Sequence, residues 1–523
     1  MDLDAGPLPS LPYAGRMAGA TTGIEGERGP REVELKLALR EADLPSLRRR
    51  LSRLGEGEEL EVDNVYFDTA DRLLRANRMA LRLRRIGRRW VQTLKTEARA
   101  GALASRGEWE VPAPRGRLDL SRFAEAPLGA LLQAHPGARL QPAFRTRFRR
   151  TVWNAGGGAI EVALDEGEIG AGDRRAPILE LELELKSGPV DALYRLAAGL
   201  AGKGSDALAL LPAVESKAVR GYRLAAAEPA VPLKANAAAV MGELARDTTL
   251  AAALRRVVER GTTLLLANAA GGITGGDPEF VHQARVAVRR VRSAARLLGK
   301  AAGWPASLDA DLRWIARRLG AVRDWDVLQA QTLPALAAAA PAAEPLAARA
   351  AEARRRDDEA LRQALASPRY ARLALRLLRW VDSPADDGPT LASAAAGRLK
   401  RLHRRLFGPA AFFVALPVAE QHRVRIRAKR LRYALDLFGA ALPAKPAKRY
   451  VGRLAHLQDE LGALTDAVVA AELAPRLARA AGVDAQPALD WLEQQHRQCA
   501  VRAEAALADL AGLPRPWDRR QVA

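Results

Sequence analysis

The chain has 523 residues, of which 49% are hydrophobic and 27% charged, a balance that predicts a folded protein of roughly two to four domains. Its single cysteine, Cys499, excludes a disulfide framework. The sequence shows no signal pattern and no apolar run of transmembrane length, so we expect a cytoplasmic protein.

The formal net charge of +21 is concentrated in the second half of the chain. Residues 1–225 hold 36 of the 82 Lys and Arg and 31 of the 61 Asp and Glu, which leaves 46 and 30 for the rest. The first half is therefore nearly balanced and the second is strongly basic. A positive field of this kind attracts polyanions such as nucleic acid, anionic lipid or polyphosphate.

The predicted elements change character once along the chain. After a Gly- and Pro-rich lead, alternating polar and apolar residues predict strands from Glu32 to about Leu185, with helices at 43–54 and 189–202. Beyond Pro229 and Pro232 the periodicity is helical, with a predicted Gly-rich loop at 268–277. The predicted segments are a disordered lead (1–29), a strand-rich domain (30–225), a linker (226–237), a helical domain (238–512) and a flexible tail (513–523).

The helical part contains an internal repeat. The pattern that begins at His282 recurs at His422, 140 residues later, and Leu319-Gly320-x-x-x-Asp324 recurs as Leu461-Gly462-x-x-x-Asp466 after 142 residues. Two matched patterns in the same order predict a duplicated helical unit.

In the strand-rich part, one strand face carries like charges. Alternation places Glu180, Glu182 and Glu184 on one face, and Glu32, Glu34 and Lys36 on another. A solvated sheet face is the simpler interpretation of any one strand. Three neighbouring glutamates, however, raise one another's pKa unless cations lie close. Lysines, arginines or Mg²⁺ with substrate phosphates would meet that need.

These residues resemble the CYTH, or triphosphate tunnel metalloenzyme, superfamily. The ordered motifs are Glu32-x-Glu34-x-Lys36, Tyr66-Phe67-Asp68-Thr69, Leu81-Arg82-Leu83-Arg84, Leu94-Lys95, Arg106-x-Glu108-x-Glu110, Ile160 to Asp165, Leu179 to Glu182 and Glu215-Ser216-Lys217. The resemblance implies an α+β fold with a closed antiparallel β-tunnel, Mg²⁺ or Mn²⁺, and hydrolysis of a triphosphate.

The resemblance also implies a role for each matching residue. The implied metal ligands are Glu32, Glu34, Glu108, Asp165, Glu180 and Glu182; the phosphate-binding residues are Arg82, Arg84, Lys95, Arg150 and Lys217; and the catalytic group is Glu32, Glu34 and Lys36. Inorganic triphosphate is the expected substrate. A thiamine triphosphatase, an adenylyl cyclase and a tunnel that is no longer catalytic remain alternatives.

In the helical part, cations are spaced like a buried heptad seam. His282, Arg285, Arg289, Arg292 and Arg296 form one helix stripe, and a second begins at His422. Like charges along one face destabilise a helix unless something negative offsets them. Asp324, Asp326, Asp459 and Asp466 on neighbouring helices are possible partners. Two stripes in duplicated units, each headed by a histidine, favour an anion site.

This region resembles the CHAD domain, which implies two pseudo-symmetric helical bundles around a basic groove that binds polyphosphate. The implied ligand-binding residues are His282, Arg285, Arg289, Arg290, Arg292, Arg296, His422, Arg425, Lys429, Arg430 and Arg432. The other histidines lack metal-ligand spacing. Nucleic acid is a less favoured ligand because its motifs are missing and aromatic residues are few. Polyphosphate granules are then a possible location.

Overall fold

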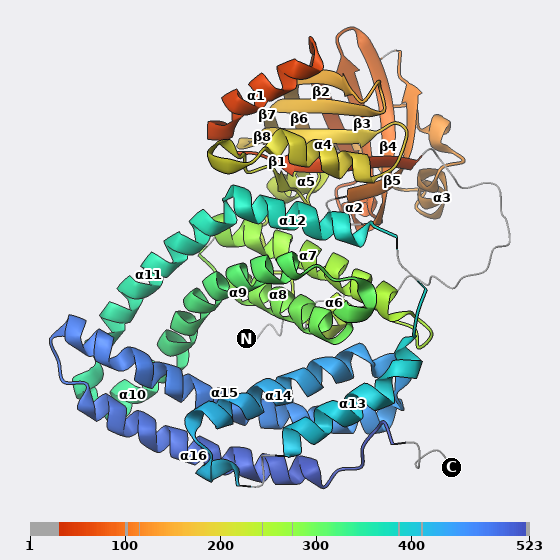
Figure 1. Cartoon of the computed structure of the whole chain (residues 1–523). Coiled ribbons are helices and arrows are strands. Elements are labelled where there is room, and N and C mark those ends of the chain that lie inside the picture. The colour runs from red at the N-terminus through yellow and green to blue at the C-terminus, as the bar shows by residue number, and fades with distance from the viewer. Residues whose placement is uncertain are drawn as a thin grey trace.

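The computed structural model describes residues 31–99, 103–114, 116–242, 244–274, 276–384, 387–408 and 412–518. The side chains of residues 31, 32, 97–99, 103–106 and 342 lie outside that description, as do the predicted lead over 1–29 and the last five residues of the predicted tail. The described residues form an antiparallel sheet domain followed by an all-helical domain, as the sequence predicted (Figure 1).

The sheet domain is a tunnel of eight strands closed by pairing of β1 with β5. Every pairing is antiparallel, in the order β1-β5-β4-β3-β2-β6-β7-β8 and back to β1, and short β9 adds to β1. The strands are β1 (Arg31–Ala38), β2 (Glu58–Asp68), β3 (Met79–Ile86), β4 (Arg89–Arg99), β5 (Leu103–Pro112), β6 (Gln141–Ala155), β7 (Ile160–Ala171), β8 (Arg174–Leu185) and β9 (Leu211–Pro212).

Alternation along the strands separates a charged interior from an apolar exterior. Leu35 and Leu37 of β1 are fully buried outside the tunnel, in a core shared with α1 (Leu44–Leu51) and α4 (Asp191–Ala201). These two helices confirm the helices predicted at 43–54 and 189–202. Helix α5 (Lys217–Ala226) packs on β6, β7 and β8, and carries Lys217 to the tunnel cavity. Short helices α2 (Leu73–Ala76) and α3 (Pro127–Ala134) complete the domain.

The helical domain consists of two units that lie side by side (Figure 1). The first holds α6 (Ala237–Met241), α7 (Leu250–Thr274), α8 (Pro278–Leu298), α9 (Ala306–Val327), α10 (Leu333–Ala339), α11 (Leu346–Leu365) and α12 (Pro368–Val381). The second holds α13 (Leu391–Phe407), α14 (Val418–Leu437), α15 (Ala444–Ala481) and α16 (Gln486–Ala511). Helices α8 and α14, which carry the two repeated motifs, pack against each other.

The predicted Gly-rich loop at 268–277 is wrong over most of its length, because α7 continues to Thr274. The glycines serve close helix packing instead. A Cβ on Gly271 would overlap the ring of Phe280 in α8, and one on Gly261 would overlap Val291. Glycine lets the two helices approach where any larger side chain would separate them.

The two domains share one hydrophobic core. Helix α12 packs on α4 and β9, and its Arg379 Nε donates to Asp191 Oδ1 at 2.6 Å. Next to it, the hydroxyl of Tyr194 donates to Asp382. At the far end of the helical domain Trp517, in the segment predicted as a tail, is buried against Tyr450. Across the described residues, we find no helix with both the length and the apolar character of a membrane span.

Candidate active site

The tunnel surrounds a cavity of about 840 Å³. Charged side chains from several strands and from α5 line it, among them Glu34, Lys36, Arg82, Arg84, Glu182 and Lys217. Strand register brings the charges together in rows. Arg150 of β6 lies opposite Asp165 of β7, and Asp165 lies opposite Glu180 of β8. Side chains in register across neighbouring strands are close enough to interact, so each row mixes acid and base.

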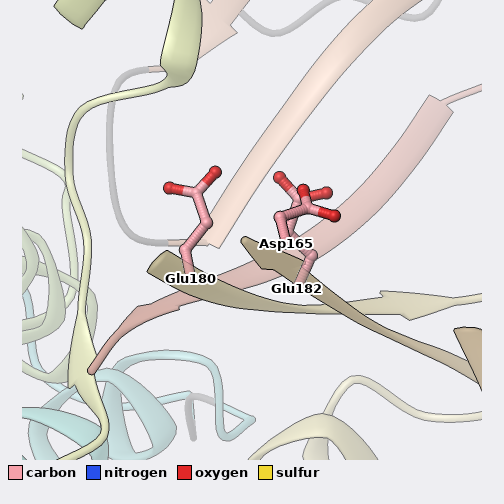
Figure 2. A group of neighbouring side chains, drawn as sticks. All are labelled: Asp165, Glu180 and Glu182. Carbon is pink, nitrogen blue, oxygen red and sulfur yellow. The ribbon is translucent and has the colours of Figure 1, made fainter. Parts of the chain in front are cut away.

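Three carboxylates form the acidic centre of the tunnel. Ligand atoms of Asp165, Glu180 and Glu182 all lie within 4.8 Å of one another, and Figure 2 shows the side chains projecting together from β7 and β8. Their side chains are 0%, 2% and 12% exposed, respectively. Three carboxylates this close and this buried can stay ionised only if cations neutralise them.

Lysine and arginine supply that neutralisation. Lys217 Nζ lies 2.6 Å from Asp165 Oδ2 and 3.0 Å from Glu182 Oε1, and also pairs with Glu180. Burial lowers the pKa of Lys217, but the three carboxylates outweigh burial and raise it. Lys36 Nζ bridges Glu34 Oε1 at 2.7 Å and Glu182 Oε1 at 3.0 Å.

Arg150 also pairs with this acidic centre. Its Nη2 lies 2.7 Å from Asp165 Oδ2, and it pairs with Glu182 as well. Burial raises the pKa of Glu182, but Lys217, Lys36 and Arg150 together hold it well below the usual range. Glu182 is therefore ionised at neutral pH.

The opposite wall carries cations with fewer acidic partners. Lys95 Nζ lies 3.0 Å from Glu108 Oε2, and Arg82 Nη2 lies 3.6 Å from Glu108 Oε1. Arg84 Nε donates to Asn64 Oδ1 at 2.8 Å. Burial, followed by Arg82 and Arg150, lowers the pKa of Arg84 to about 9. A buried guanidinium next to two others is a strong site for an anion, because an anion would relieve their repulsion.

The structure places most of the predicted tunnel residues around one cavity, with three qualifications. Asp165 and Glu180 are buried next to Glu182 and are not among the residues that line the cavity. The side chain of Glu32 lies outside the described residues, and Glu108 lies with the basic wall rather than in the acidic centre. Sequence reasoning missed Asn64, which is 1% exposed and also donates to Thr146 Oγ1 at 2.8 Å. Its position two residues before Tyr66 on the same strand face is a signal that could have identified it.

A second charged site lies where α8 and α14 meet. We define the central cluster as Arg285, Arg289, Arg323, Arg425 and Lys429, with His282 and His422 beside them and two carboxylates, Asp324 and Asp466, among them. Burial first, and then the charges of Arg425, Arg289 and Arg285, lower the pKa of Lys429 to about 7. Both helical units therefore contribute charge to one site.

The carboxylates of the central cluster only partly offset its cations. Arg285 Nη2 lies 3.9 Å from Asp324 Oδ1. Burial raises the pKa of both Asp324 and Asp466, although the surrounding arginines lower both, and Asp466 raises that of Asp324 further. Asp326, another possible partner from the sequence, instead accepts from Arg354 Nε at 2.7 Å.

Other members of the predicted stripes lie apart from the central cluster. Arg290 Nη1 donates to Asp436 Oδ2 at 3.0 Å, and Arg432 Nε donates to Asp436 Oδ1 at 3.1 Å. Arg292 Nε lies 3.7 Å from Asp309 Oδ1. These ion pairs join α8 to α14 and to α9. The stripes thus divide into residues that gather in the central cluster and residues that hold the helices together.

Comparison with known proteins identifies both parts. Residues 30–207 match the CYTH domain family and residues 256–475 match the CHAD domain family. The chain carries a CYTH domain followed by a CHAD domain. The crystal structure of the CHAD domain from the plant Ricinus communis is 36% identical, covering 55% of this chain and 98% of that one with a TM-score of 0.50. The family resemblance and the two-domain fold predicted from the sequence are confirmed.

Two curated relatives differ in how much they share. An inorganic triphosphatase of Haemophilus influenzae is 35% identical over 201 residues, which are 37% of this chain and 54% of that relative. The match thus spans about half of that relative's length. An uncharacterized protein of Mycobacterium tuberculosis is 29% identical over 93% of this chain and 98% of its own length.

Replacing Lys217 with methionine should expose the electrostatic problem of the tunnel. Without metal and at pH 7, we expect Lys217→Met to lower the free energy of unfolding by about 3–5 kcal/mol, because it leaves three buried carboxylates poorly neutralised. Lys186→Met removes a half-exposed lysine that pairs with Glu184 and should change it by less than about 1 kcal/mol.

The pH dependence gives the sign of the effect. In the wild type the pKa of Glu182 is lower in the folded state than in the unfolded state, so this carboxylate stabilises the fold at pH values above its unfolded pKa. That contribution to the free energy of unfolding is lost as the pH falls through the folded pKa. In Lys217→Met the carboxylate pKa values should rise above their unfolded values. Acidification should therefore narrow the difference in free energy of unfolding between this variant and the wild type. Urea unfolding in EDTA at several pH values measures this, and a gap that stays constant down to pH 4 would contradict it.

Proposed function

We propose that the CYTH domain hydrolyses inorganic triphosphate to diphosphate and phosphate with a divalent metal, and that the CHAD domain binds polyphosphate. The observation that carries the first part is that a basic wall and Glu182 of the acidic centre line one cavity, with Asp165 and Glu180 buried next to Glu182. Phosphoryl transfer requires both charge types, because catalysis consists mainly of positioning and electrostatic stabilisation. The inorganic triphosphatase relative supports this assignment.

The acidic centre fits Mg²⁺ or Mn²⁺. Asp165, Glu180 and Glu182 offer hard carboxylate oxygens at close spacing, as these ions prefer, and they would hold the metal. When bound, the ion would neutralise charge on phosphate oxygens. Lys217 now holds this position by pairing with all three carboxylates, and a bound triphosphate would offer its ammonium other partners.

The basic wall would bind and orient the triphosphate. Arg82, Arg84 and Lys95 line the cavity, and their charge would stabilise the diphosphate leaving group as its bond to the terminal phosphorus breaks. A water oxygen forms the new bond to that phosphorus. Glu34, next to Lys36, is the carboxylate we assign to accept the hydrogen bond and the proton of that water.

One observation favours a second candidate substrate. The cavity also has apolar lining from Leu60, Val62, Ile86 and Val152, and its volume of about 840 Å³ can hold an organic group. An organic triphosphate, as in thiamine triphosphatase or adenylyl cyclase chemistry, is therefore the alternative. A panel of tripolyphosphate, thiamine triphosphate and ATP tests it, and we expect tripolyphosphate to have the highest kcat/KM.

Carboxylate substitutions test catalysis. Glu34→Gln and Glu182→Gln should each reduce kcat for phosphate release from tripolyphosphate by about 10²-fold or more, because each removes a charge that acts in the transition state. Glu168→Gln, on the exposed side of β7 near Arg175, is the matched control and should retain activity. EDTA should abolish activity, and Mg²⁺ or Mn²⁺ should restore it. Full activity in both tunnel variants would show that the tunnel is not the catalytic site.

The central cluster supports the second part of the proposal. Cations from two helical units converge there around Asp324 and Asp466, so an extended polyanion would relieve their mutual repulsion. At fixed ionic strength, long-chain polyphosphate should compete better than DNA of equal charge, because few aromatic side chains are available to stack bases.

Proton uptake provides a direct signature of binding at this cluster. In the protein without ligand, the pKa of Lys429 lies at about 7, so its amine is mostly neutral at pH 8.5. A bound polyanion should restore the positive charge. Calorimetry in two buffers of different ionisation enthalpy should show uptake of about one proton. Lys429→Met should lose most of that uptake, whereas Lys448→Met, an exposed lysine on α15, should retain it. Equal uptake in both variants would place the ligand elsewhere.

A further inference from the structure

The two units of the CHAD domain differ at one pair of positions that the repeat makes equivalent. Because His422 follows His282 by 140 residues, Arg290 corresponds to Arg430, and Arg296 corresponds to Asp436. The contact between Arg290 and Asp436 therefore corresponds to a contact between Arg430 and Arg296. Both pairs of positions join one unit to the other, so an ion pair on one side of the interface between α8 and α14 is replaced by two cations at the equivalent positions on the other side.

The carboxylate of Asp436 closes the basic face at one end. It accepts from Arg290 and from Arg432, at 3.0 and 3.1 Å, and its side chain is only 7% exposed. Both arginines are thereby neutralised in the interface between α8 and α14. An anion that extended in this direction would meet a carboxylate whose cations are already paired.

The other end remains open and basic. Arg430 lies near Arg296, Arg405 and Arg427. Burial lowers the pKa of Arg430, and the charges of these three arginines lower it further. We define these four residues as the arginine cluster. Within the described part of the chain, none of the four lies within ion-pairing distance of a carboxylate. Arg427 Nη1 is buried and has no hydrogen-bond partner among the described residues.

Helix geometry connects this cluster to the central cluster. At 100° per residue, Arg285, Arg289, Arg292 and Arg296 fall within a sector of about 60° on α8. Arg296 thus continues the face that carries the central cluster. Arg398 of α13 donates to the carbonyl of Leu297, which holds α13 and its Arg405 beside the end of α8.

We propose that the arginine cluster is an outer subsite for polyphosphate, so that a long chain runs from the central cluster toward α13 and not toward Asp436. This inference rests on the proposed binding of polyphosphate by the CHAD domain. It adds that the groove is one-sided despite the pseudo-symmetry of the fold. Short chains fill the central cluster alone, whereas long chains gain contacts with the arginine cluster.

Two variants test the subsite by different means. Arg405→Gln/Arg430→Gln removes two of its exposed charges. Arg296→Asp copies the closed end, because an aspartate there is placed as Asp436 is and can pair with Arg430. Arg355→Gln/Arg356→Gln removes two exposed charges from α11, which lies across the domain from α13 (Figure 1), and is the matched control.

Binding is measured in the full chain carrying Glu34→Gln, with EDTA, by anisotropy of end-labelled long-chain polyphosphate and its displacement by tripolyphosphate. Each test variant should weaken long-chain binding by about tenfold and change the inhibition constant of tripolyphosphate by less than about twofold. The control should leave both nearly unchanged. Long-chain binding at wild-type strength in both test variants, or equal losses for both ligands, would overturn the one-sided groove alone. No binding by the parent chain would overturn the proposed polyphosphate binding itself.

Discussion

Buried like charges are the constraint on which this structure depends. Strand register brings carboxylate oxygens of Asp165, Glu180 and Glu182 within 4.8 Å of one another. Their ionisation requires cations at short range, which Lys217, Lys36 and Arg150 provide. In the proposed function a bound triphosphate would also draw on Lys217, so stability without ligand and binding of substrate would share that contact.

The helical domain solves the opposite problem with the same physics. There the crowded charges are positive, and Asp324 and Asp466 offset them only in part. The tunnel therefore combines acid and base, as metal-assisted cleavage requires. The central cluster has an excess of cations, as suits holding a polyanion. Helix α12 and the shared core pack the two domains against each other.

The sequence predicted the tunnel well because period-two alternation determines which strand face each charge occupies. Alternation placed Glu34 with Lys36, and Arg82 with Arg84, on one strand face, and the family resemblance implied that such faces line a tunnel. These four residues and Glu182 do line the cavity. The groove was harder to predict, since helix spacing places Arg290 and Arg432 among the cations but does not reveal that Asp436 neutralises them. Such partners come from packing between helices far apart in sequence. The predicted loop at the Gly-rich segment was wrong for the same reason. Gly271 lies in a helix and allows the close approach of Phe280, a contact that the sequence does not reveal.

Equilibrium metal binding tests the central claim most directly, because it does not depend on turnover. Titration of the full chain with Mn²⁺, followed by the electron paramagnetic resonance signal of the free ion, should show about one bound ion that Glu182→Gln weakens by about tenfold or more. Glu168→Gln should bind as the wild type does. Wild-type affinity in Glu182→Gln would contradict the account, because it would place the metal outside the carboxylate centre on which the proposed chemistry depends.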